Sequence, residues 1–134
     1  FGSEAGEHRN YSAEALVPSK IRSFPQPANE AQAGYMLKLA LRSLSRAQDH
    51  LLVIGRQSAS ERIAAFLVDM AARQEDLDHV ELPMSRQDIA DYLGLTIETI
   101  SRVFTRLRTD GLIDLPTSRS VILKKRNALA RMAA

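Results

Sequence analysis

The chain has 134 residues, of which 45% are hydrophobic and 25% charged, enough for one compact domain or two small ones. It contains no cysteine, which excludes disulfides, thiolate metal sites and thiol redox chemistry from these residues, and it has no apolar run long enough to span a membrane. Because no signal peptide is visible either, we expect a cytoplasmic protein.

The charged residues are unevenly distributed, although the formal net charge is only +2. Residues 1–83 carry nine basic and eleven acidic side chains, a balance of −2. Residues 84–134 carry nine basic and five acidic ones, a balance of +4. This asymmetry favours a polyanion as the partner of the C-terminal part.

Residues 1–27 are irregular at first and then alternate in a β-rich manner around "AEALVPSKIRSF". Val17, Ile21 and Phe24 are too few to form a core of their own, so we interpret this stretch as the remnant of a larger β-structure. Pro25 and Pro27 disfavour helix at and before their positions and therefore mark the end of this stretch.

Residues 28–56 are predicted to form one long helix, which Gly55 helps to end. Its apolar positions have a heptad pattern, with Leu37, Leu44 and Leu51 seven residues apart and Ala40, Ala47 and Ile54 three residues beyond them. Such a seam is typical of a helix that pairs with a partner, and it predicts a homodimer interface. The alternative is an amphipathic helix that packs on its own domain.

Residues 57–134 begin with a capping box, in which Ser58 caps a helix and Glu61 is its third residue. The apolar spacing extends this helix to about Arg73. The acidic segment "EDLDH" is predicted to be a connecting loop, and "HVELP" is a candidate short strand.

The next part of the sequence predicts two short helices with a tight turn between them. Ser85 can cap the helix "RQDIADYLG", Thr96 can cap a second helix that runs to about Thr109, and Gly111 stops it. The apolar residues on either side of "PTSRS" predict a β-hairpin, and "NALARMAA" predicts a last helix. The predicted fold is therefore mainly helical with small β elements: a β-roll remnant, a dimerisation helix and a winged helix-turn-helix.

The second helix of this unit has two distinct sides. Ile100, Val103, Phe104 and Leu107 have the spacing of a core-facing stripe, whereas Glu98, Ser101, Arg102 and Thr105 lie on the opposite side. The N-terminal residues of such a helix enter the major groove of DNA, where arginine can bind guanine and glutamate can accept from cytosine. Glu98, Ser101 and Arg102 are the predicted base contacts. The alternative is a solvated face on which Glu98 pairs with Arg102.

Contacts to the DNA backbone are predicted from two further groups of residues. Ser85, Arg86, Gln87 and Thr99 lie near helix N-termini, where backbone amides also favour phosphate. Arg106, Arg119 in the hairpin turn, and Lys124–Arg126 are additional candidates. Such contacts fix the register of a protein on DNA without specifying the sequence.

The segment "MSRQDIADYLGLTIETISRVFTRLRTDGLI" resembles the helix-turn-helix of the CRP/FNR family of bacterial transcription regulators. The E-x-x-S-R pattern at Glu98, Ser101 and Arg102 is similar to the FNR and FixK branch, which reads TTGAT-type half-sites. The resemblance implies a homodimer on a palindromic DNA site, with activation through contacts to RNA polymerase. It also implies that residues 28–56 form the dimerisation helix and that residues 1–27 are the end of a β-roll sensor domain.

Two departures from the family pattern bear on cofactors. Members that bind cyclic nucleotides carry an Arg-Ser pair, whereas Tyr11 precedes Ser12 here. The iron–sulfur cluster of FNR-type members requires cysteines, and FixK-like members lack the cluster. We therefore expect a FixK-like regulator without a cofactor, connected with nitrogen fixation and micro-oxic metabolism.

Two other classes of function compete with DNA binding. A winged helix can serve as a protein-interaction module without specific DNA readout, but the basic C-terminal balance argues against this. An enzyme fits the sequence least, because His8, His50 and His79 lack metal-ligand spacing and no nucleophile–base pair or phosphate-binding glycine loop is visible.

Overall fold

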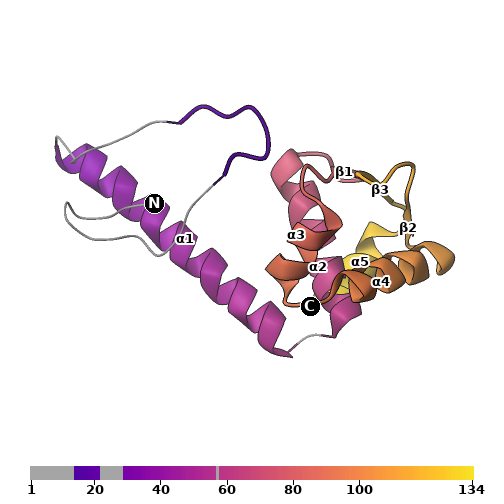
Figure 1. Ribbon diagram of the computed structural model, residues 1–134. Helices are drawn as coiled ribbons and strands as arrows, with labels where there is room; N and C mark the ends of the chain where they lie inside the picture. The colour runs from indigo at the N-terminus through magenta and orange to yellow at the C-terminus, as the bar shows by residue number, and fades with distance from the viewer. Residues whose placement is uncertain (1–13, 22–28, 57) are drawn as a thin grey trace.

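The computed structural model describes residues 14–21, 29–56 and 58–134, which fold into a long helix and a compact winged part (Figure 1). The long helix, α1 (Glu30–Arg56), extends away from the rest of the molecule. The winged part consists of α2 (Ala59–Gln74), β1 (His79–Glu81), α3 (Arg86–Leu93), α4 (Ile97–Thr109), β2 (Ile113–Asp114), β3 (Ser120–Leu123) and α5 (Arg126–Ala133). The predicted fold class, mainly helical with small β elements, is confirmed.

Helix α1 begins two residues later than predicted, after Asn29, whose Oδ1 accepts a hydrogen bond of 2.9 Å from the amide of Gln32. Three leucines of the predicted heptad seam are largely exposed within the chain: Leu37 by 60%, Leu44 by 55% and Leu51 by 69%. Ala40 and Ala47 are exposed as well, whereas Ile54 is partly buried. The chain by itself therefore leaves most of this apolar face uncovered.

The N-terminal stretch predicted to be β-rich contains no strand among the residues that the structure describes. Within residues 14–21 the chain bends at Leu16 and Val17 and forms no strand. Leu16, Val17 and Ile21 are 54%, 52% and 90% exposed. A strand needs a neighbour to satisfy its backbone hydrogen bonds, and no described segment pairs with this one. Phe24 and residues 1–13 lie outside the described residues.

The winged part is built on α2. The predicted capping box is present: the Ser58 amide donates to Glu61 Oε2 at 2.6 Å, and the Glu61 amide donates to Ser58 Oγ at 3.4 Å. Hydrogen bonds from Ser58 to the Glu61 carboxylate, that of the Ser58 backbone first and then that of its side chain, lower the pKa of Glu61. Helix α2 buries Ile63, Ala64, Phe66, Leu67 and Ala71, and α5 packs along it with Leu129 fully buried.

A three-stranded antiparallel sheet closes the domain, with the strand order β1-β3-β2. The predicted hairpin is confirmed as β2 and β3, in which Ile113 pairs with Leu123. The predicted short strand in "HVELP" is also confirmed, because Val80 of β1 pairs with Val121 of β3. Strand β1 precedes the helix-turn-helix and β3 comes after it, so the two helices are connected at both ends to one sheet.

Candidate nucleic-acid interface

Helix α3 starts at a second capping box. The Ser85 amide and hydroxyl donate to Asp88 Oδ2 at 2.8 and 2.7 Å, and the Asp88 amide donates to Ser85 Oγ at 3.1 Å. The two hydrogen bonds that the Asp88 carboxylate accepts from Ser85, that of the side chain first, lower the pKa of Asp88. The cap fixes where α3 begins, and buried Ile89 and Leu93 seat it on the core.

A glycine turn joins α3 to α4. Gly94 has a φ of 62°, in the left-handed region that L side chains rarely adopt, and its amide donates to Asp91 O at 3.3 Å. The amide of Leu95 donates to Ala90 O at 2.9 Å and completes the termination of α3. Thr96 then caps α4, since its Oγ1 accepts from the Thr99 amide at 3.2 Å.

Helix α4 presents two opposite faces, as predicted. Ile100, Val103, Phe104 and Leu107 are buried, whereas Glu98, Ser101, Arg102 and Thr105 are exposed. The helix ends at Thr109, and Gly111, with a φ of 67°, follows its cap residue Asp110. The Leu112 amide donates to Leu107 O at 2.9 Å. The three predicted base contacts therefore lie together on the solvent side of the first half of α4.

Hydroxyl groups along α4 bond back to its own carbonyls. Ser101 Oγ donates to Ile97 O, Thr105 Oγ1 to Ser101 O and Thr109 Oγ1 to Thr105 O, each at 2.9 Å. Because the hydroxyl proton of Ser101 is already donated, the lone pairs of its oxygen are what it offers to an outside group. In this rotamer Ser101 can act only as a hydrogen-bond acceptor toward an outside group.

The alternative of a self-paired face is not seen. No ion pair joins Glu98 to Arg102 in the winged part that the structure describes, although the two are four residues apart. Arg102 is exposed, and so is Glu98. Both charged groups therefore remain available for an external partner.

The predicted backbone contacts near the helix N-termini differ in their surroundings. Ser85 is engaged with Asp88, and Gln87 Nε2 donates to Asp91 Oδ1 at 2.8 Å. Thr99 is partly buried, with its hydroxyl 3.0 Å from that of Thr96. Of these side chains, Ser85 and Gln87 would have to change hydrogen-bond partners in order to donate to a phosphate.

Arg86 has a contact that the sequence did not indicate. Its Cζ lies 3.6 Å from the centroid of the Phe104 ring, so the guanidinium of α3 stacks against the buried side of α4. Its Nη1 is buried and has no hydrogen-bond partner, and burial lowers the pKa of the group, which stays charged. The signal was absent from the sequence because a residue at a helix N-terminus and an aromatic residue eighteen positions later come together only through the turn.

Comparison with known proteins identifies this unit. The Crp-like helix-turn-helix domain family matches residues 61–132, which is more than half of the chain. The chain belongs to the CRP/FNR family of transcription regulators. Its sequence is 51% identical to the nitrogen fixation regulation protein FixK of Rhizobium meliloti (strain 1021) over 129 residues, which cover 96% of this chain and 61% of that protein.

Two further relatives support a place near FixK within the CRP/FNR family. The transcriptional activatory protein AadR of Rhodopseudomonas palustris is 57% identical over 82 residues, or 58% of this chain and 34% of AadR. The structure of FixK2 from Bradyrhizobium japonicum superposes with a TM-score of 0.75 and 39% identity, covering 79% of this chain and 54% of FixK2. The chain thus spans about three fifths or less of the length of these relatives.

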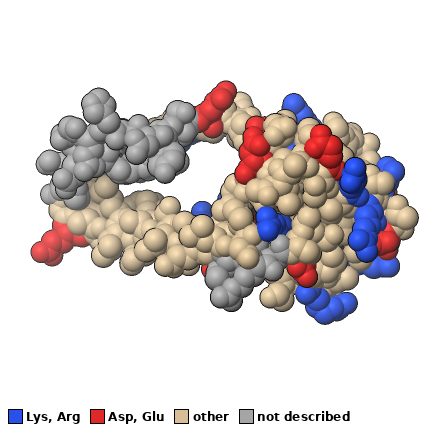
Figure 2. All heavy atoms as spheres, turned by 60° about the horizontal axis from the view of Figure 1, so that its bottom comes forward, with Lys and Arg blue, Asp and Glu red and all other residues tan. Residues whose placement is uncertain are grey.

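The other predicted backbone contacts of this CRP/FNR domain lie on α4, in the hairpin and at the start of α5. Figure 2 shows Lys and Arg gathered on the side of the winged part where α4, β2 and β3 lie in Figure 1. Arg106 is 76% exposed with its Nε 3.8 Å from Asp110, and Lys124 lies 3.3 Å from Asp114. Arg119 in the hairpin turn and Lys125 are exposed, whereas Arg126 is partly buried with an unpartnered Nε.

The part of the chain that the structure describes contains no group of three or more histidine and acidic side chains placed to hold a metal ion. None of its helices combines the length and the hydropathy needed to cross a bilayer.

Proposed function

We propose that this chain carries the dimerisation and DNA-binding parts of a regulator that binds a TTGAT-type palindrome as a homodimer. The observation that carries the proposal is the capped α3–turn–α4 unit, which holds Glu98, Ser101 and Arg102 on one exposed face. A regulator of this kind acts in the cytoplasm, where bacterial DNA lies.

Each of the three side chains has a chemical counterpart in the proposed site. Arg102 can donate two hydrogen bonds to O6 and N7 of guanine, and Glu98 can accept from N4 of cytosine. Ser101, whose proton goes to Ile97 O, can accept from N6 of adenine or N4 of cytosine. A TTGAT half-site and its complement ATCAA contain all of these groups.

Dimerisation rests on the uncovered face of α1. Leu37, Leu44 and Leu51 are each more than half exposed, and the small Ala40 and Ala47 would allow two helices to approach closely. Figure 2 shows few charged side chains along the visible side of this helix. Pairing through this seam would place two α4 helices at two half-sites about one turn of DNA apart.

Activation is the extension of the proposal that the relatives support. AadR is named a transcriptional activatory protein and FixK a nitrogen fixation regulation protein. We therefore propose a transcription activator of genes connected with nitrogen fixation, with RNA polymerase as its protein partner.

The test is binding to a TTGAT-N4-ATCAA duplex and to a scrambled duplex of the same composition, measured by fluorescence anisotropy at fixed salt. Replacing Arg102 by Ala should cost about 1–3 kcal/mol on the specific site and much less on the scrambled one. Arg108→Ala is the matched control, because Arg108 is exposed on the same helix and has no proposed base partner.

The outcomes separate the candidate functions. Equal affinity of the unmodified protein for both duplexes would contradict sequence-specific readout and favour the protein-interaction alternative. An equal loss on both duplexes in the Arg102→Ala variant would show that Arg102 contacts the backbone rather than a base.

A further inference from the structure

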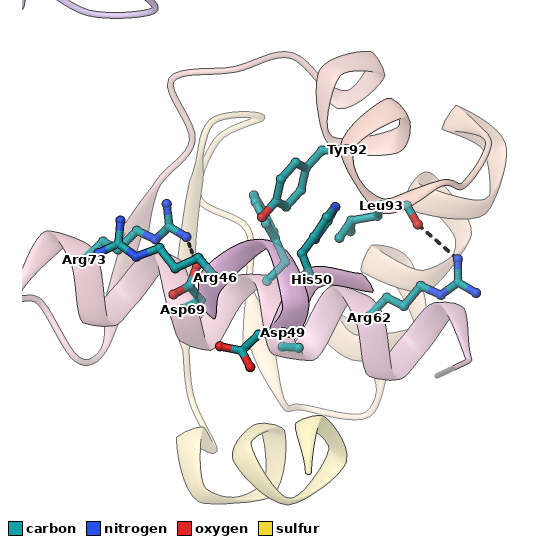
Figure 3. Close-up of a pocket in the computed structure, with 10 residues that line it drawn as sticks. Arg46, Asp49, His50, Arg62, Asp69, Arg73, Tyr92 and Leu93 are labelled. Atoms are coloured by element: carbon teal, nitrogen blue, oxygen red, sulfur yellow. Dashed lines mark hydrogen bonds and ion pairs between the residues drawn. The ribbon is translucent and has the colours of Figure 1, made fainter. Parts of the chain in front are cut away.

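A hollow of about 190 Å³ lies where α1 meets the helix-turn-helix (Figure 3). Arg46, Asp49 and His50 of α1 line one side of it, and Tyr92 and Leu93 of α3 line another. Side chains of α2, among them Phe66, complete its wall. The junction between the proposed dimerisation helix and the proposed DNA-binding unit is therefore only partly filled.

Tyr92 is the aromatic link across this junction. Its ring stacks on that of His50, with the centroids 4.1 Å apart and an interplanar angle of 24°. It also contacts Phe66 of the buried core, with the centroids 6.0 Å apart and the rings tilted by 56°. Tyr92 is thus in contact with α1 through His50 and with the core of the winged part through Phe66.

A second contact lies close by, at the end of α3. A Cβ atom at Gly94 would stand 3.7 Å from Ile54 Cγ2, so the last turns of α1 reach the turn that precedes α4. Arg62 Nη1 donates to Leu93 O at 3.1 Å and joins the start of α2 to the same turn. These few contacts relate the direction of α1 to that of α4.

The angle at this junction matters because a small rotation moves the far ends of α1 and α4 by several ångströms. With a rise of 1.5 Å per residue, the 27 residues of α1 extend about 40 Å and the 13 residues of α4 about 20 Å. Rotation by roughly 10° over an arm of about 20 Å displaces its end by about 3.5 Å, close to the rise of one DNA base pair. In a dimer paired through α1, the same rotation changes the separation of the two α4 helices.

We propose that the Tyr92–His50 stack sets the angle between α1 and the helix-turn-helix, and thereby the half-site spacing that the dimer prefers. Tyr92 and His50 are positioning residues that contact no base. This inference rests on the proposed function, because spacing has a meaning only for a dimer that reads two half-sites.

The experiment measures the affinity of the intact chain for TTGAT-Nn-ATCAA duplexes with n of 3, 4 and 5, for one isolated half-site, and for a scrambled duplex. An aromatic pair contributes about 0.5–1.5 kcal/mol, which corresponds to about 2- to 12-fold in an equilibrium constant. Tyr92→Ala should therefore reduce the ratio of the affinity for the best spacer to the affinity for the other two by about 2- to 12-fold. Affinity for the isolated half-site should stay as in the unmodified protein.

Three further variants define the origin of the effect. Tyr92→Phe keeps the ring and should retain the original spacing preference. His50→Ala should reproduce the effect of Tyr92→Ala, and the double variant should add little to either, because both remove the same contact. Tyr35→Ala is the control, since Tyr35 is a 55% exposed aromatic residue elsewhere on α1.

An unchanged spacing preference in Tyr92→Ala would overturn the inference while leaving the proposed function intact. An equal loss of affinity for every specific duplex and for the isolated half-site would also overturn the inference, because that pattern indicates damage to α3 and α4 themselves. If the unmodified protein fails to distinguish the TTGAT duplexes from the scrambled one, the proposed function itself is wrong.

Discussion

Replacing Arg86 by Met separates the stability of the helix-turn-helix from its affinity for DNA. The guanidinium lies 3.6 Å from the Phe104 ring centroid and leaves Nη1 buried without a partner. Methionine retains an unbranched side chain that can occupy the same space over the ring. The substitution therefore removes a charge and its unpaired donor without removing the packing.

The net effect on stability is the sum of three contributions. Loss of the cation–π contact costs about 0.5–2 kcal/mol, whereas a sulfur–aromatic contact returns about 0.3–1.5 kcal/mol. Removal of a buried unpaired donor gains about 1–3 kcal/mol. The middle of these ranges gives a stabilisation of about 1–2 kcal/mol. Urea unfolding at a fixed protomer concentration should then show a midpoint higher by about 0.5–1 M.

The same substitution should weaken DNA binding, because Arg86 is a predicted phosphate contact. We expect a similar loss of affinity for the specific and the scrambled duplex. The slope of the logarithm of the affinity against the logarithm of the salt concentration should become smaller by about one. Arg131→Met, an exposed position on α5, is the control for the loss of a positive charge. A stability loss of about 1 kcal/mol or more would refute the energetic reasoning, and an unchanged salt slope would refute the phosphate contact.

Three other predictions concern the cap, the turn and the seam. Asp88→Asn should flatten the pH dependence of the urea unfolding midpoint. A lowered carboxyl pKa stabilises the fold above about pH 4, and this stabilisation is lost as the pH falls through the folded-state pKa. An acid-induced drop in the midpoint equal to that of the unmodified protein would contradict this prediction. Gly94→Ala should cost about 1–2 kcal/mol of unfolding free energy through its φ of 62° alone, since its Cβ would meet only ordinary contacts, and a neutral result would show that the turn can relax. Leu44→Glu should abolish the dimer in sedimentation experiments. Leu39→Glu is the control and should leave the dimer intact, because Leu39 lies off the seam and is 44% exposed. An unchanged dimer in the Leu44→Glu variant would show that the heptad assignment is wrong.

Local signals predicted most of the winged fold. The cap residues Ser58, Ser85 and Thr96 and the turn glycines Gly94 and Gly111 act within four or five residues of themselves, so their effect can be read from the sequence. The inward face of α4 is a result of helical spacing alone. Tertiary contacts were not accessible in this way, and this is why the stack of Arg86 on Phe104 and the junction of Tyr92 with His50 emerged only from the structure.

The absence of a strand at residues 14–21 has the same origin. Alternation of apolar residues describes a strand that already has a sheet to join, and the pattern itself does not supply the neighbour. Leu16 instead lines a surface hollow beside Phe66 and Met84. The candidate base contacts were placed on the expected face, but the acceptor role of Ser101 depended on a rotamer that no sequence pattern encodes.

The strand order β1-β3-β2 has a consequence for the order of events during synthesis. The hydrogen bonds of β1 go to β3, and α2 packs against α5, so the earliest and latest segments of the winged part are in direct contact. These contacts have high sequence separation and can form only after the last of those residues has left the ribosome. A growing chain that already contains α4 would therefore not yet hold it in place, and binding to DNA would begin only once synthesis of the domain is finished.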